Sequence, residues 1–237
     1  HTWIEFANRL LAPTSGVPAA IMLFLSFLLW RKSGRRDLFL FSLGVILFMG
    51  FEAWLGKIVV EGNLVPGHIT MHMFGTFIIL AFLLMNIFRS RREQSLIAVD
   101  SRFRLVIILT LVLLMLQTFM GTQVREDVDA LLSAEVARNL LIDNVSFWFY
   151  IHRTFSLVLL GLVGWIFWKN ATQYRLKSVQ LLAIFVLLEI LVGVVLVYGN
   201  MPAWMQPVHL WLTVGMFCVL VWQILQTRGN RATLANS

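Results

Sequence analysis

The feature that most constrains the fold of this 237-residue chain is an internal duplication. Residues 189–213 repeat residues 52–76 in one ungapped register, at an offset of 137 positions. The positions that are identical in both copies include a glutamate and a histidine inside apolar sequence: Glu52 and Glu189, Gly56 and Gly193, Val60 and Val197, Gly62 and Gly199, Asn63 and Asn200, His72 and His209, Thr76 and Thr213. Each copy predicts an apolar helix with the glutamate, a Gly-Asn turn, and a second helix with the histidine in its first turns. Two copies predict two equivalent halves of the fold and two equivalent sites.

The composition places both halves in a membrane. Hydrophobic residues make up 59% of the chain and its mean hydropathy is +0.82, which exceeds what a soluble domain of this length can bury. The formal net charge of +7 comes from short basic clusters between apolar segments, so it indicates membrane topology and not a nucleic-acid partner. The sequence therefore predicts an all-α integral membrane protein that is surrounded by the lipid bilayer.

Seven apolar segments are each long enough to cross a hydrocarbon core of about 30 Å as a helix. They cover residues 10–30, 38–60, 67–88, 104–123, 147–168, 178–199 and 206–227. The basic clusters fall at alternate connections, around residues 31–36, 89–104, 169–177 and 228–231. Because positively charged loops stay in the cytoplasm, the opposite face is predicted to be the outer one. We expect a multi-pass protein of the cell inner membrane with its active-site side toward the periplasm.

The connection 124–146 is the sizeable segment between the predicted spans. Its apolar residues recur near helical spacing after a polar start, which predicts a short helix on the outer membrane surface: Leu131, Leu132, Val136, Leu140 and Leu141. A solvated connector between the two halves and a functional lid are alternatives that the sequence leaves open.

The two halves differ in their number of predicted helices. Residues 101–237 contain four and residues 1–100 contain three, so the duplication predicts a further helix before residue 1. The expected architecture of the full protein is two pseudo-symmetric four-helix bundles with about eight spans, of which this chain holds seven. Residues 1–100 are predicted to form the N-terminal bundle, and residues 101–237 the C-terminal bundle.

Two histidines of the C-terminal half, His152 and His209, lie at similar predicted depths on different helices. Two neutral imidazoles that face each other inside a four-helix bundle are what a haem iron needs for axial ligation. The alternative is that each histidine only hydrogen-bonds a neighbouring helix. The presence of His72 in the register of His209 favours the ligand role.

The N-terminal half has Glu5 and Asn8 where the C-terminal half has Phe149 and His152, at an offset of 144 positions. An amide is a poor iron ligand, so a haem in this half would be held by His72 with a weak or open position opposite. Such a site suits chemistry, whereas two histidine ligands suit electron transfer. Glu5 is then a candidate proton acceptor or donor. The alternative is an interfacial carboxylate that the helix dipole stabilises.

Four further charged residues occupy equivalent positions in the two halves. Arg9 and Arg153 either bind haem propionates or extend to lipid headgroups. Glu52 and Glu189 lie within predicted spans, where an ionised carboxylate is costly. We interpret them as protonated residues with a structural hydrogen-bonding role, and a proton path is the alternative.

Five segments carry a resemblance to a known family: Trp3–Leu10 (WIEFANRL), Gly62–His72 (GNLVPGHITMH), Gly121–Glu126 (GTQVRE), Phe149–Arg153 (FYIHR) and Pro207–His209 (PVH). Their order and spacing make the chain resemble the haem A synthase family over nearly its whole length. The resemblance implies an eight-helix, pseudo-twofold membrane enzyme that oxidises the C8 methyl of haem O to a formyl group, giving haem A for terminal oxidases. The chain is similar to a bacterial type in which Asn8 replaces the first haem-ligand histidine.

The resemblance also implies roles for individual residues. The residues implied to bind a haem b cofactor are His152 and His209, as iron ligands, and Arg153. The residues implied to bind the substrate haem O are His72, facing its iron, Asn8 and Arg9. Glu5 is implied to be the catalytic carboxylate. Haem O synthase and an electron donor in the membrane are the implied partners, and the sequence allows a homo-oligomer.

Two other classes of protein stay open at this point. A diheme b-type transmembrane electron carrier would place one haem near each face, whereas the three ligand histidines are all predicted near the outer face. A non-catalytic haem-binding assembly protein would explain the histidines but gives Glu5 no role. Identification of the bound haems separates both classes from the synthase.

Overall fold

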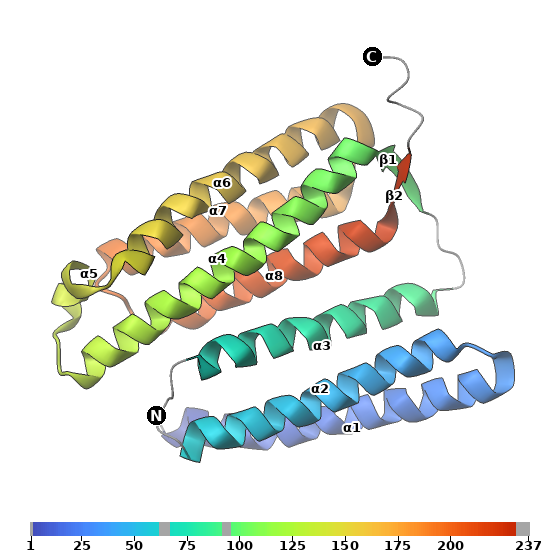
Figure 1. Cartoon of the computed structure of the whole chain (residues 1–237), viewed down its shortest axis with the longest axis horizontal. Helices are drawn as coiled ribbons and strands as arrows, with labels where there is room; N and C mark the ends of the chain where they lie inside the picture. The colour runs from blue at the N-terminus through green and yellow to red at the C-terminus, as the bar shows by residue number, and fades with distance from the viewer. Residues whose placement is uncertain (1, 62–66, 92–95, 231–237) are drawn as a thin grey trace. The chain divides into compact units, whose positions relative to one another are not determined.

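The computed structural model describes the backbone of residues 2–61, 67–91 and 96–230, and the side chains of these residues except 2–9, 12, 59–61 and 230. The chain forms two compact units, His1–Gln94 and Ser95–Ser237, which we call unit 1 and unit 2. Helices dominate both units (Figure 1). The fold is therefore all-α, as the sequence predicts.

Unit 1 contains three long helices that run side by side in Figure 1: α1 (Thr2–Ser33), α2 (Arg36–Glu61) and α3 (His68–Ser90). Helix α2 packs against both of the others. At the α2–α3 interface the Asn86 side-chain amide donates a hydrogen bond of 3.2 Å to the Ser42 hydroxyl, and both residues are buried. Because polar side chains in an apolar span need partners on neighbouring helices, this bond fixes the pairing of α2 with α3.

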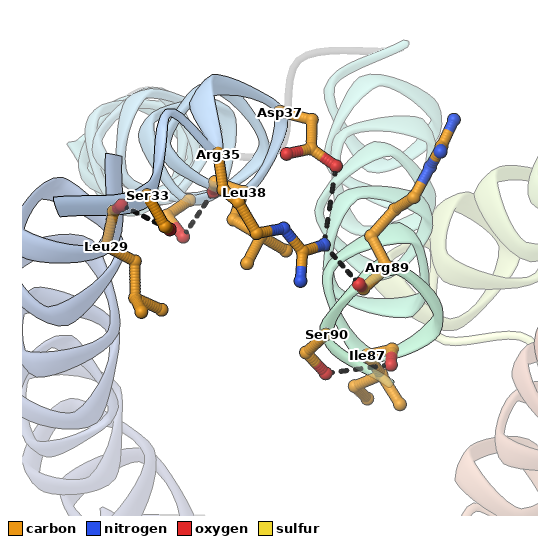
Figure 2. Close-up of polar contacts among 9 residues, drawn as sticks. Leu29, Ser33, Arg35, Asp37, Leu38, Ile87, Arg89 and Ser90 are labelled. Atoms are coloured by element: carbon orange, nitrogen blue, oxygen red, sulfur yellow. Dashed lines mark hydrogen bonds and ion pairs between the residues drawn. The ribbon is translucent and has the colours of Figure 1, made fainter. Parts of the chain in front are cut away.

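The end of unit 1 where α1 turns into α2 is held by Arg35 (Figure 2). Gly34 adopts a left-handed backbone with φ of +72°, which lets the chain reverse direction between the two helices. The Arg35 guanidinium then donates a hydrogen bond to the backbone carbonyl of Arg89 and lies 3.6 Å from the Asp37 carboxylate. A cation at the end of α3 satisfies a carbonyl that has no partner within the helix, so Arg35 ties the α1–α2 turn to α3.

Unit 2 is built from four long helices: α4 (Ser101–Ser133), α6 (Phe147–Lys169), α7 (Lys177–Tyr198) and α8 (Met205–Gln226). Each helix packs against two others, with α4 between α6 and α8 and α7 between α8 and α6 (Figure 1). Side-chain caps define two of the helix starts, since Asp100 accepts hydrogen bonds from Arg102 and Phe103 backbone amides and Ser146 accepts one from Trp148. The result is a closed four-helix bundle.

Two short strands pair in parallel in unit 2: β1 (Ile97–Asp100), which directly precedes α4, and β2 (Thr227–Asn230), which directly follows α8. The sequence analysis does not predict them, because four residues give too little periodicity for a strand assignment. Side chains from the bundle hold the pair in place. The Asp100 amide donates to the Tyr174 hydroxyl at 3.0 Å, and Arg104 donates to the Thr227 carbonyl at 3.1 Å.

The region 124–146 differs from the predicted short surface helix. Helix α4 does not stop at residue 123 but continues to Ser133, and a 3-10 turn (Arg138–Leu140) and the short helix α5 (Leu141–Asn144) follow. An i, i+4 ion pair between Arg125 and Asp129 at 2.8 Å contributes to the stability of this polar extension. Leu141 and Val145 are buried against the bundle end, in a cluster with Val128, Phe149, Val192, Leu196 and Met201.

Within the described residues, seven helices are long and apolar enough to cross a membrane. Each buries one face in its own unit and leaves large apolar side chains exposed on the other, including Leu105, Leu157 and Leu187 at 62–63% exposure. Such faces are stable in hydrocarbon and not in water. The protein is a multi-pass membrane protein, and the predicted spans are confirmed apart from the longer α4 and an earlier start of α1.

Candidate functional site

Unit 2 brings two imidazoles together inside its bundle. His152 lies in the second turn of α6 and His209 in the second turn of α8. The centroids of the two rings are 6.3 Å apart and the ring planes are inclined by 69°. The sequence predicts this juxtaposition from the similar depths of the two residues, although the helices that carry them are separated along the chain by α7.

Helix α4 holds the ring of His152 through a reciprocal pair of contacts with Gln117. The Gln117 side-chain amide donates a hydrogen bond of 2.9 Å to the His152 carbonyl, and His152 Nδ1 lies 3.2 Å from the Gln117 carbonyl oxygen. One turn further along α4, Gly121 lies directly against the imidazole. A Cβ at this position would be only 3.1 Å from His152 Cε1, so a glycine is what lets the ring approach α4 so closely.

His209 is held by α7 through a carboxylate. Its Nδ1 lies 3.4 Å from Oε2 of Glu189, whose other oxygen accepts a hydrogen bond of 2.5 Å from the Thr213 hydroxyl. Thr213 also donates to the His209 backbone carbonyl at 3.3 Å, one turn earlier in α8. Glu189, Thr213 and His209 therefore form one polar cluster across the α7–α8 interface.

Unit 1 repeats this arrangement between α2 and α3. Nδ1 of His72 contacts Oε2 of Glu52, and the Thr76 hydroxyl donates to the His72 carbonyl at 3.0 Å. The Glu52 carboxylate packs onto Gly75, where an added Cβ would collide with it. The imidazole of His72 is more open than its repeat counterpart, with side-chain exposures of 52% for His72 and 26% for His209.

The donor chemistry of these residues fits an iron porphyrin. Nδ1 of His152, His209 and His72 each faces an oxygen atom, so Nε2 is the nitrogen that is left for a metal. The described part of the chain contains no group of three or more His, Cys, Asp or Glu side chains that could bind a metal ion by themselves. A haem supplies four nitrogens of its own and needs only two imidazoles. A ring separation of 6.3 Å accommodates an ion between them, because bonds from metal to imidazole nitrogen are about 2 Å long.

The other predicted site residues are placed less fully. The Arg153 guanidinium is exposed and lies 5.7 Å from the ring centroids of both Phe149 and Tyr150, with which it forms cation–π contacts at the start of α6. Glu5, Asn8 and Arg9 belong to the first turns of α1, and their side chains lie outside the described residues.

Sequence reasoning missed two features of this site. Gln117 received no role, although a glutamine within the apolar run LVLLMLQTFMG is the kind of residue that normally bonds a neighbouring helix. The sequence predicts a structural hydrogen-bonding role for Glu52 and Glu189 but gives no partner for it, and the structure places each glutamate beside the histidine of its own repeat. The equal spacing of 20 residues between glutamate and histidine in both copies was the available signal.

The fold and the site together define a multi-pass membrane protein with a Glu–His pair in each of two repeats and a third histidine opposite one of them. The family model COX15-CtaA, described as cytochrome oxidase assembly protein, matches residues 1–221. The chain belongs to this family, the haem A synthase family, and its role is in cytochrome oxidase assembly. No curated protein matches the chain significantly.

Proposed function

We propose that the protein is a haem A synthase, which oxidises the C8 methyl of haem O to a formyl group. Unit 2 would bind a haem b cofactor, and unit 1 would bind haem O as the substrate. Membership of a cytochrome oxidase assembly family supports this proposal, because terminal oxidases of the haem A type need this modified porphyrin. The observation that carries the proposal is the close pair of imidazoles, His152 and His209, whose ring centroids are 6.3 Å apart.

In unit 2 the residues have a binding and orienting role. His152 and His209 would hold the cofactor iron from opposite sides, and Arg153 would interact with its propionates. Haem b, when bound, supplies one-electron transfer. Gln117 and Glu189 contact the two histidines in the cofactor-free protein, which favours binding with little reorganisation.

In unit 1 the proposed roles differ because the residues differ. His72 would face the iron of haem O, with Asn8 and Arg9 on the opposite helix α1. Glu5, on the same helix as Asn8 and three residues before it, would accept or donate protons beside the methyl group during its successive oxidations. The amide of Asn8 would leave the position opposite His72 weakly occupied, which suits a substrate more than an electron carrier.

The proposed location is the cell inner membrane, with the histidines toward the periplasm. The support is the charge pattern, since the basic clusters fall at the opposite ends of the helices, as at Arg31 and Lys32 in the last turn of α1. Haem O synthase as supplier of the substrate and a membrane electron donor are the proposed partners, and we include a homo-oligomer among the proposed assemblies.

Haem extraction from the purified full-length protein tests the proposal. Acid–acetone extraction followed by chromatography should yield haem B together with haem O, haem A or a hydroxylated intermediate. His209→Ala should lose the haem B fraction, whereas Tyr198→Phe, a matched change at an 83% exposed position, should retain it. Two equivalents of haem B alone, in cells that make haem O, would instead identify a diheme electron carrier.

A further inference from the structure

The contact between a glutamate and Nδ1 of a histidine is present in both repeats, although its surroundings have diverged. In unit 1 the carboxylate of Glu52 sits on Gly75, and in unit 2 the corresponding residue is Leu212. Thr76 and Thr213 each donate to the backbone carbonyl of the histidine one turn earlier, but only Thr213 also donates to the glutamate of its repeat, Glu189. What the two repeats share at the glutamate is the carboxylate at Nδ1, which points to a role for that contact itself.

A carboxylate at Nδ1 has two consequences for an imidazole. It holds the proton on Nδ1 and so leaves Nε2 as the electron-pair donor, and its charge makes the ring a stronger donor to a metal. Both glutamates are largely buried, with side-chain exposures of 9% for Glu52 and 17% for Glu189, so water competes little with Nδ1 for their oxygen atoms.

His152 provides the contrast within the same unit. Its Nδ1 lies 3.2 Å from the backbone carbonyl of Gln117, which orients the ring but carries no net charge. The two neighbouring imidazoles of unit 2 are therefore different donors, one beside an amide carbonyl and one beside a carboxylate.

We infer that Glu189 and Glu52 are positioning residues that act through His209 and His72. Each carboxylate fixes its histidine with Nε2 toward the haem iron and strengthens the histidine as a ligand. The inference rests on the proposed function, since it assumes that these histidines bind haem. In this interpretation the two glutamates control the donor strength of the histidines, and their role is neither a purely structural hydrogen bond nor a proton path.

Glu189→Gln in the full-length protein is the test, because glutamine keeps the size and the hydrogen-bonding capacity of the side chain and removes the charge. We expect haem b to remain bound but its midpoint potential to rise, since a weaker donor stabilises ferric iron less, and the low-spin ferric EPR signal to shift. Glu189→Leu, which also removes the orienting oxygen, should weaken haem b retention by about 10–100-fold. Glu135→Gln, at an exposed glutamate outside the bundle core, is the matched control and should leave potential and spectrum unchanged.

Thr213→Val separates ligand strength from structural support. This change removes the hydrogen bond to Glu189 and keeps the carboxylate, so it should move the potential much less than Glu189→Gln does. A Glu189→Gln protein with full haem b, an unchanged potential and an unchanged EPR signal would overturn the inference. Failure of the proposed function gives a different result, namely a wild-type protein without haem b, or haem b that His209→Ala does not affect.

Discussion

Nδ1 of His209 and Oε2 of Glu189 lie 3.4 Å apart across the α7–α8 interface, and the same two residue types meet between α2 and α3 as His72 and Glu52. A tandem duplication preserves sequence in each copy, but it preserves a contact between two helices only where both copies pack in the same way. The structure thus shows equivalent packing of the second and third helices of unit 1 and the third and fourth helices of unit 2. Variants that disturb only one of the two copies therefore distinguish the role of unit 1 from that of unit 2.

Gly75→Ala should disturb unit 1 alone. A Cβ at this position would collide with the Glu52 carboxylate, which must then move away from His72. Under the proposed function we expect the variant to lose bound haem O and formyl product while the haem b spectrum of unit 2 stays intact. Gly50→Ala, on α2 where no atom lies within 4 Å of an added Cβ, is the control and should retain both haems. Equal loss of haem b in Gly75→Ala would show that the variant has a general folding defect.

Gly121→Ala should disturb unit 2 alone. The added Cβ would stand 3.1 Å from Cε1 of His152, so the ring must shift away from α4, and overpacking of this kind costs about 1–3 kcal/mol. The expected result is a several-fold lower ratio of haem b to protein and an altered low-spin spectrum. Gly164→Ala on α6 meets no atom within 4 Å and should bind haem b normally. Normal haem b binding by Gly121→Ala would show that His152 is not held against α4 as described.

Parts of this organisation follow from the sequence because they depend on local properties. Span positions and the all-α membrane fold depend on the length of apolar runs, and the pairing of His152 with His209 follows from their depths. The rotation of each helix about its axis is not a local property, since it depends on which side chains fit at the interface. For that reason the Glu189–His209 contact and the role of Gln117 became visible only in the structure.

The extension of α4 illustrates the same limit in another way. Hydropathy ends a span where charged residues begin, at Arg125 in this chain, but a helix ends only where its backbone hydrogen bonds end. The ion pair between Arg125 and Asp129 supports the polar end of α4, and Val128 in the same turn packs into the cluster with Leu141. Apolar spacing alone could not distinguish this continuation from a separate surface helix.

Gln117→Leu should weaken the attachment of α6 to α4. The variant loses the hydrogen bond from the Gln117 amide to the His152 carbonyl, and a bond of this type contributes about 1 kcal/mol to stability. We expect a lower midpoint of thermal unfolding in detergent and faster loss of haem b on dilution. The backbone contact from the Gln117 carbonyl to His152 Nδ1 does not involve the side chain and persists, so haem b should still bind at saturation. A complete absence of haem b from Gln117→Leu would contradict the limited role assigned to this side chain.

Glu5→Ala should abolish formation of the formyl group and leave haem b in place. Under the proposed function Glu5 belongs to the substrate half, whereas both haem b ligands belong to unit 2. The purified variant should therefore show a wild-type haem b spectrum and accumulate haem O without haem A in the acid–acetone extract. Glu5→Asp keeps a carboxylate on a shorter side chain and should retain part of the activity, because proton transfer depends on reach. Normal haem A formation by Glu5→Ala would rule out Glu5 as the catalytic carboxylate. Loss of haem b from the variant would show that Glu5 is needed for folding of the chain and not for the reaction.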